Sequence, residues 1–108
     1  MSLVSDLKER LKRYRREHII FTTHAYEQAV FRGISLDEIK ENIINPERLV
    51  FVKLQKAHVV SEEKYDCYFG YTLTYCHRYV LVLGKRCIVC TVIRIHRKWQ
   101  EALHHEIL

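Results

Sequence analysis

Residues 22–33 read Thr22-Thr23-His24-Ala25-Tyr26-Glu27-Gln28-Ala29-Val30-Phe31-Arg32-Gly33, and the rest of the chain is organised around this stretch. Either threonine can accept hydrogen bonds from the first free N–H groups of a helix, and Gly33 can take the left-handed conformation that ends one. The stretch therefore predicts a short helix with both ends marked. At about 100° per residue, one side of this helix is polar and the other is mainly apolar. The polar side carries His24, Gln28 and Arg32, and the packing side carries Ala25, Ala29, Tyr26 and Val30.

The polar side of this helix has the groups that chemistry on a phosphate requires. The positive end of the helix dipole disfavours a charged imidazole at His24, which leaves a neutral ring able to accept a proton near pH 7. Arg32 keeps its charge and can bind a phosphate through two parallel hydrogen bonds. An ordinary solvent-facing helix would show the same two side chains, so the spacing alone leaves both interpretations open.

The segment from Ile19 to Ala25, followed by Arg32-Gly33-Ile34-Ser35 and an acidic helix start, resembles a family of small domains of unknown function allied to RelE-type ribonuclease toxins. In that family a helix carries histidine, a basic residue one turn later, and arginine before Gly-Ile-Ser. His24 and Arg32 match the first and last positions, whereas Gln28 stands where the family usually has arginine. The resemblance implies an α+β fold, RNA-directed activity and an antitoxin as a partner, and Gln28 weakens a second phosphate contact.

Length and composition predict one packed domain spanning residues 1–108. The chain is 48% hydrophobic and has only three glycines and one proline, which is typical of a packed globule. Its formal net charge of +5 favours an anionic partner such as RNA or the ribosome. We find neither the apolar run of a signal peptide nor the roughly 18 apolar residues of a membrane span, so we expect a cytoplasmic protein without a membrane partner.

The first segment, residues 3–16, predicts an amphipathic basic helix. Leu3, Leu7, Leu11 and Tyr14 recur at three- and four-residue spacing, with cations on the remaining surface. These cations could lie along a phosphate backbone and add affinity without sequence preference, although a solvated helix face has the same pattern. The candidate nucleic-acid contacts are Lys12, Arg13, Arg15 and Arg16, together with Gln28 and, near the C-terminus, Arg97 and Lys98.

The remaining pattern predicts an α+β fold, with N-terminal helices packed on an antiparallel sheet of about four to five strands, RelE-like, and a C-terminal helix. Ser35 and Glu38 form a capping-box pattern for a helix that ends before Pro46, whereas Ile19–Phe21 reads as a short apolar link. After Pro46 the period becomes two, and Gly84-Lys85 suits a hairpin turn. The expected strands are 48–54, 58–61, 65–75, 78–83 and 87–95. Trp99, Ala102, Leu103 and Ile107 make a final helical stripe.

The last expected strand ends in two groups that can act on a phosphate, Arg94 and His96. Strict alternation places both on one face with Ile88, Cys90 and Val92, and the opposite face carries Cys87, Val89, Thr91, Ile93 and Ile95. A strand end is a rigid support for catalytic groups, but it is also a common boundary with solvent. Tyr75 is the tyrosine that we select from an aromatic row, which could stack unpaired bases or simply face the core.

Metal chemistry is not expected, although the chain has seven histidines and four cysteines. Cys87 and Cys90 would point to opposite faces of a strand and His104 and His105 diverge on a helix, so neither pair can hold one ion. No cofactor is expected. The cysteines of an intracellular protein stay reduced, so we also expect no disulfides.

The leading prediction is an RNA-directed domain similar to RelE-type toxins, whose activity would be that of a metal-independent endoribonuclease that leaves 2′,3′-cyclic phosphate ends. His24 would act as base or acid, Arg32 and Arg94 would hold the phosphate, and His96 or Tyr75 would carry the second proton. We expect these groups to cluster within about 10 Å of one another around a common phosphate position. The alternative, which Gln28 favours, is a non-catalytic nucleic-acid- or protein-binding module on the same fold.

Overall fold

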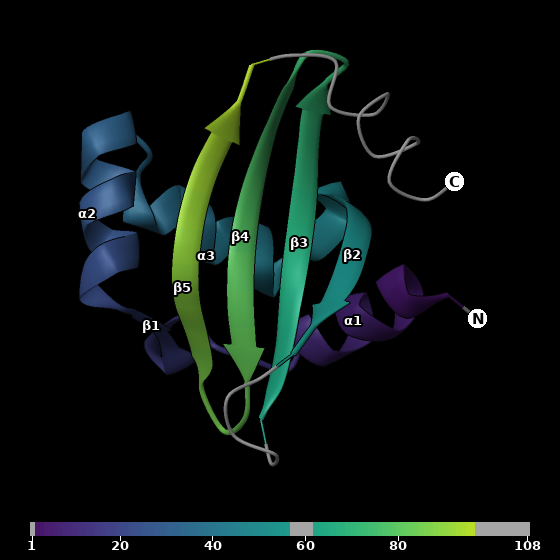
Figure 1. Ribbon diagram of the computed structural model, residues 1–108. Coiled ribbons are helices and arrows are strands. Elements are labelled where there is room, and N and C mark those ends of the chain that lie inside the picture. The colour runs from purple at the N-terminus through teal and green to yellow at the C-terminus, as the bar shows by residue number, and fades with distance from the viewer. Residues whose placement is uncertain (1, 57–61, 97–108) are drawn as a thin grey trace.

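The computed structural model describes residues 2–56 and 62–96, which form three helices and a five-stranded sheet (Figure 1). The strand order is β1-β5-β4-β3-β2, and β1 runs parallel to β5 whereas the other neighbours are antiparallel. The helices are α1 (Leu3–Leu11), α2 (Thr23–Arg32) and α3 (Leu36–Ile44). The strands are β1 (Ile19–Phe21), β2 (Leu49–Gln55), β3 (Glu63–Thr72), β4 (Tyr75–Leu83) and β5 (Cys87–Ile95), and the short 3-10 helices are η1 (Arg16–His18) and η2 (Pro46–Arg48).

All three helices contribute to one core on one face of the sheet. In Figure 1, α1 and α3 lie behind the sheet and α2 lies beside β5. The helices bury Leu11, Ala29 and Ile39 together with Phe69 and Leu81 of the central strands. The α+β class is confirmed. The expectation of a purely antiparallel sheet is wrong, because Ile19–Phe21 forms a parallel edge strand instead of a link.

The expected bounds of α2 are confirmed. The Thr22 hydroxyl accepts a hydrogen bond from the Ala25 N–H at 3.1 Å, and Gly33 ends the helix with a φ of 67°. Only the alanines of the expected packing side are buried, whereas Tyr26 and Val30 are 50% and 62% exposed. The buried face of α2 is therefore narrow, and Tyr26 and Val30, which lie about 100° round the helix from Ala25 and Ala29, face solvent.

The first helix is shorter than predicted, because α1 ends at Leu11 rather than at residue 16. The chain turns away after Leu11, and the Tyr14 hydroxyl donates to the Gly84 carbonyl oxygen at 2.6 Å. This bond fixes the segment against the turn between β4 and β5. Residues 12–16 therefore do not form a continuous basic helix face.

The expected strand 65–75 is also wrong at its end, because the chain reverses at Leu73 and Thr74 and Tyr75 begins β4. The Thr72 hydroxyl accepts a hydrogen bond from the Thr74 N–H at 3.2 Å, which lets a side chain close the turn without glycine or proline. Strands β2 and β5 match their expected ranges within one residue. The expected segment 58–61 and the expected C-terminal helix lie outside the described residues.

A β-bulge in β5 changes which residues share a face. Val80 pairs with Thr91 but Leu81 pairs with Val89, so Cys90 is an extra residue on β5. Val89 and Val92 are consequently both buried in the core beneath the helices. The expected strict alternation fails at this point, and the residues that follow Val92 at period two, Arg94 and His96, lie on the helix-covered face.

Gln28 completes the hydrogen bonding of β5 beyond the bulge. β1 pairs with β5 only as far as Val89, and further along the Gln28 Oε1 accepts a hydrogen bond from the Val92 N–H at 2.8 Å. We expect Gln28→Ala to lower the free energy of unfolding by about 1–3 kcal/mol, because it leaves a buried N–H without a partner. Urea unfolding measures this, with Glu27→Ala on the exposed side of α2 as the control. An unchanged midpoint in Gln28→Ala would refute this structural role.

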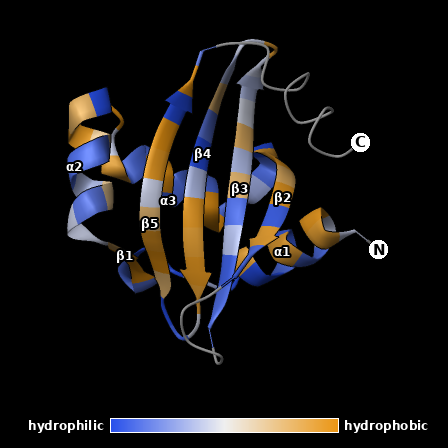
Figure 2. Cartoon of the chain, viewed as in Figure 1, coloured by the Kyte–Doolittle hydropathy of each residue, from blue (hydrophilic) through white to orange (hydrophobic). Residues whose placement is uncertain are grey.

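Hydropathy divides the central strand along its length. The part of β4 that leads into the turn with β5 is apolar, whereas its first half is more polar (Figure 2).

All four cysteines are free thiols, and burial raises the pKa of Cys87 to about 12. No described helix is long and apolar enough to cross a membrane.

Candidate functional site

The first half of β4 places three polar rings on the helix-covered face of the sheet. Tyr75, His77 and Tyr79 alternate with residues of the other face, so their side chains follow one another along the strand. Their neighbours are Tyr71 from the end of β3 and Asn42 from α3. His77 and Tyr79 have no exposed surface. The site therefore begins at the end of the sheet and continues into the core.

Hydrogen bonds join these side chains into one chain, which we call the Tyr-His network. The Tyr75 hydroxyl lies 2.8 Å from Nε2 of His77, and Nδ1 of His77 lies 2.7 Å from the Tyr79 hydroxyl. Asn42 Nδ2 donates to the hydroxyls of Tyr79 at 2.9 Å and Tyr71 at 2.8 Å. The network ends where the Tyr71 hydroxyl donates to Glu38 Oε2 at 2.7 Å.

The hydrogen-bond partners determine which atom donates and which accepts in each bond of the network. Because the Tyr79 oxygen accepts from Asn42, its own proton is donated to His77 Nδ1. A neutral imidazole that accepts at Nδ1 carries its hydrogen on Nε2, so His77 donates to the Tyr75 oxygen. The Tyr75 hydroxyl proton is then directed away from the network. This half-buried hydroxyl can donate to a bound group.

Burial keeps His77 neutral. Desolvation lowers the pKa of His77 to about 4, and Glu38 opposes this shift whereas the charges of Arg94 and Arg48 reinforce it. Burial likewise raises the pKa of Tyr71 to about 12 and raises that of Tyr79. His77 therefore orients Tyr75 rather than exchanging protons with solvent near pH 7.

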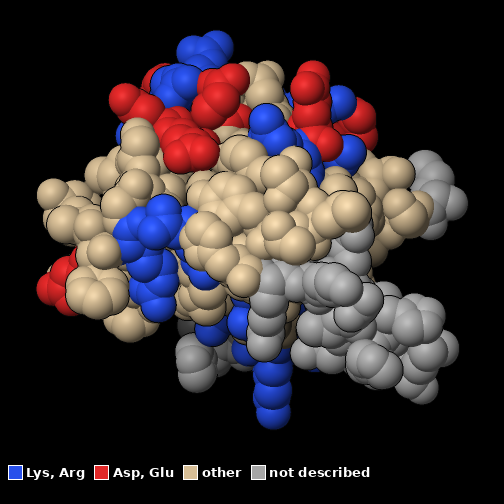
Figure 3. All heavy atoms as spheres, turned by 90° about the horizontal axis from the view of Figure 1, so that it is seen from above, with Lys and Arg blue, Asp and Glu red and all other residues tan. Residues whose placement is uncertain are grey.

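The rim of this site combines aromatic rings with cations. The His96 ring lies 4.8 Å from the Tyr75 ring, centroid to centroid, at an interplanar angle of 32°. The Arg48 guanidinium lies 4.1 Å above the centre of the Tyr71 ring. Figure 3 views this end of the molecule, where uncharged side chains occupy the middle, basic side chains lie beside them, and acidic and basic side chains are mixed along one edge. Rings flanked by cations are the elements that bind unpaired bases and phosphates.

The sequence-predicted catalytic residues come from two parts of the fold, the helix α2 and the ends of β4 and β5. Tyr75 and His96 are in ring contact, and Arg94 pairs with His77 across β5 and β4. His24 is exposed in the first turn of α2 and Arg32 is half-buried in its last turn. A rise of 1.5 Å per residue separates these two positions by about 12 Å along the helix axis, with Gln28 bound to β5 between them.

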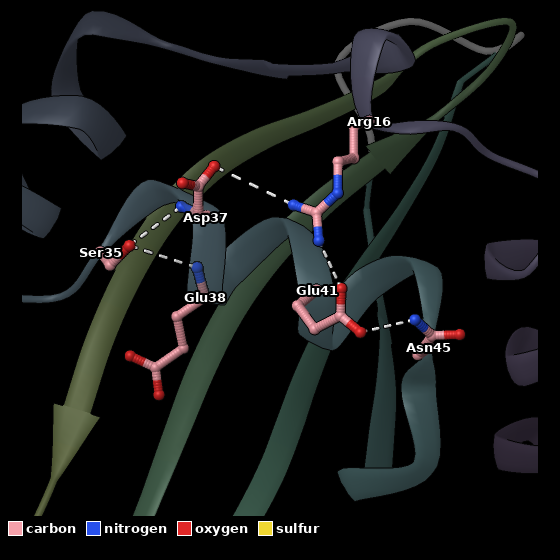
Figure 4. Close-up of polar contacts among 6 residues, drawn as sticks. All are labelled: Arg16, Ser35, Asp37, Glu38, Glu41 and Asn45. Atoms are coloured by element: carbon pink, nitrogen blue, oxygen red, sulfur yellow. Dashed lines mark hydrogen bonds and ion pairs between the residues drawn. The ribbon is translucent and has the colours of Figure 1, made fainter.

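Two of the predicted nucleic-acid contacts in residues 12–16 form ion pairs within the protein. Arg16 extends from η1 to α3, where it forms ion pairs with Asp37 at 4.0 Å and with Glu41, which also accepts from Asn45 (Figure 4). Lys12 lies 3.5 Å from Glu9. Arg13 and Arg15 are exposed, and Arg97 and Lys98 lie outside the described residues. Arg16 is therefore mainly a link between η1 and α3.

Sequence reasoning missed His77, Asn42 and Glu38. The signal for His77 was the pattern Tyr75-x-His77-x-Tyr79, which at a strand period of two places three polar rings on one face. Asn42 and Glu38 lie one turn apart on α3, as two residues facing the same strands must. Because the predicted strands were 65–75 and 78–83, Tyr75 and Tyr79 fell in different strands and His77 fell in neither, so the pattern was not recognised.

Among the described residues, no three His, Cys, Asp or Glu side chains are grouped so that they could hold a metal ion.

No protein-family model, curated protein sequence or solved structure matches the chain.

Proposed function

We propose that this chain is an RNA-directed domain similar to RelE-type toxins, and that it cleaves RNA without a metal ion at the end of the sheet where β5 ends. The observation that carries the proposal is the contact between the Tyr75 and His96 rings, with Arg94 paired to His77 on the neighbouring strand. Two proton carriers and a cation lie at one edge, which is the minimum that cleavage through the ribose 2′-hydroxyl requires.

In the proposed reaction the base is His96, and not His24 as the sequence predicts, because His96 is the histidine in contact with Tyr75. His96 takes the proton of the 2′-hydroxyl while the 2′ oxygen attacks phosphorus. The bond from phosphorus to the 5′ oxygen breaks, and this oxygen takes the hydroxyl proton of Tyr75. The products are a 2′,3′-cyclic phosphate and a 5′-hydroxyl, and the proton held by His96 returns through water to Tyr75.

The surrounding residues support these roles. His77 donates to the Tyr75 oxygen and so stabilises the negative charge that develops there when Tyr75 gives up its proton. Arg94 and Arg48 are exposed cations that can neutralise the charge on phosphorus. The Tyr71 and Tyr75 rings offer surfaces on which flanking bases can stack.

Incubating the full chain with RNA, and separately with translating ribosomes, in the presence of a chelator tests the proposal. We expect 2′,3′-cyclic phosphate ends, formed about 100-fold more slowly by His96→Ala and by Tyr75→Phe, because each removes one proton carrier. His24→Ala is the matched comparison. If His24→Ala abolishes cleavage and His96→Ala does not, the site lies on α2 and the proposed site is wrong.

A non-catalytic RNA-binding module is the second candidate. The Val92 N–H donates a hydrogen bond to Gln28 Oε1, which favours this candidate because the bonded Gln28 oxygen and its amide are held at β5 and not at a phosphate. This candidate requires binding without any cyclic phosphate product. The affinity for single-stranded RNA should then fall steeply as the salt concentration rises. Arg94→Ala should make this salt dependence weaker. Contact with an antitoxin through apolar residues would respond little to salt.

A further inference from the structure

A basic cavity lies at the opposite end of the sheet from the Tyr-His network. It has a volume of about 310 Å³ and forms where the last turn of α1 and the residues after it meet the turn between β4 and β5. Its cations come from distant parts of the sequence. The lining residues are Arg10, Arg13, Tyr14, His18, Gly84 and Lys85.

The cavity has an excess of positive charge that its neighbours only partly neutralise. Arg10 forms an ion pair with Glu63 and also donates to the Tyr65 hydroxyl at 3.1 Å. Both bonds come from Nη1, so within the described residues its Nε and Nη2 hydrogens remain as donors. Arg13 and Lys85 are exposed. Three permanent cations against one carboxylate leave a net charge that matches a dianion.

The frame of the cavity is held by hydrogen bonds that do not use these cations. The Tyr14 hydroxyl donates to the Gly84 carbonyl oxygen, which ties the segment after α1 to the turn. His18 Nδ1 accepts a hydrogen bond from the Arg15 N–H at 3.1 Å, so a neutral His18 carries its hydrogen on Nε2. The lining therefore combines N–H donors with two aromatic side chains, Tyr14 and His18.

We propose that this cavity binds the phosphomonoester group of a nucleotide. Such a phosphate carries a charge of about −1.5 to −2 at pH 7 and accepts hydrogen bonds at three oxygens. The cavity volume lies at the lower end of the roughly 300–1,000 Å³ that is typical of small-molecule pockets. This volume is larger than an inorganic ion alone would occupy. Tyr14 and His18 offer ring faces for the base, and Arg10, Arg13 and Lys85 hold the phosphate.

The same group has two sources, a free nucleotide and the 5′-phosphorylated end of an RNA chain. The site is separate from the Tyr-His network and does not depend on the proposed cleavage. A titration of the ¹⁵N-labelled full chain, followed through backbone amide resonances, compares adenosine 5′-monophosphate with adenosine. We expect saturable shifts at Gly84, Lys85 and Arg13 with the nucleotide and none with adenosine.

Two variants and one matched control complete the test. Arg13→Ala and Lys85→Ala should each weaken nucleotide binding about tenfold, because each removes a charged hydrogen-bond donor to the phosphate. Arg86→Ala removes an exposed cation from the same turn that does not line the cavity, and it should leave the affinity within twofold. All three side chains are at the surface, so folding is retained.

Dinucleotides with and without a 5′-phosphate separate the two sources. Tighter binding of the phosphorylated dinucleotide than of the mononucleotide identifies an RNA end as the ligand, whereas equal or weaker binding identifies a free nucleotide. The proposal is overturned if adenosine binds as well as its monophosphate, if no shift saturates, or if Arg86→Ala weakens binding as much as Arg13→Ala and Lys85→Ala do.

Discussion

Arg78→Ala is expected to lower the free energy of unfolding by about 3 kcal/mol, because it leaves a buried carboxylate without its partner. Asp66 is only 2% exposed and lies on the opposite face of the sheet from the Tyr-His network. Arg78 donates to both of its oxygens, from Nε at 2.7 Å and from Nη2 at 2.6 Å. The Gln55 amide adds only a longer bond, at 3.3 Å. The value is at the lower end of the range for buried pairs because the Arg78 side chain is 30% exposed.

Urea unfolding of the wild-type chain and of Arg78→Ala measures this loss. Arg86→Ala removes a solvent-facing arginine and should change stability by less than about 0.5 kcal/mol. Combining Asp66→Leu with Arg78→Met should recover much of the loss, because apolar residues remove both charges together. Equal midpoints for Arg78→Ala and Arg86→Ala would mean that the pair contributes nothing measurable.

Acidification from pH 6.5 to pH 4 is expected to remove about 3 kcal/mol of stability through His77. Burial lowers the pKa of His77 to about 4 in the folded chain, and an unfolded histidine has a pKa of about 6.5. Between these values the unfolded chain binds more protons than the folded chain, so stability falls as the pH falls. Protonation would also remove the acceptor at Nδ1 that Tyr79 uses.

Unfolding free energies measured at several pH values for the wild-type chain and for His77→Gln isolate this contribution. His77→Gln lowers stability at every pH, and its curve should be flatter between pH 6.5 and pH 4 because the titrating group is absent. Near-UV circular dichroism confirms that the variant is folded before the slopes are compared. Parallel curves would show that His77 titrates normally in the folded chain.

The sequence predicted the elements whose limits are encoded locally. Thr22 and Gly33 mark α2, Ser35 accepts hydrogen bonds from the backbone of Asp37 and Glu38 at the start of α3, and the Gly84-Lys85 turn separates β4 from β5. In each case the marker and the element are adjacent, so short-range chemistry suffices.

The features that the sequence did not reveal are set by contacts between distant segments. The bulge at Cys90 is visible only in the pairing of β5 with β4, and it decides which face carries Arg94 and His96. β1 is a strand only because Cys87–Val89 lies beside it. The candidate site could be predicted in part for the same reason. Tyr75, Arg94 and His96 were selected as residue types, but their grouping with His77 depends on the register of the sheet.

The parallel edge of the sheet sets the order in which the chain can fold. Thr22 and Cys90, which are joined at this edge, lie 68 positions apart in the sequence. Closing so long a loop is entropically costly and is slow compared with forming a hairpin. The hairpins β2–β3, β3–β4 and β4–β5 need only neighbouring segments, so they can assemble first. On a ribosome, the segment from β1 through α2 emerges early and must wait for β5 before it can dock.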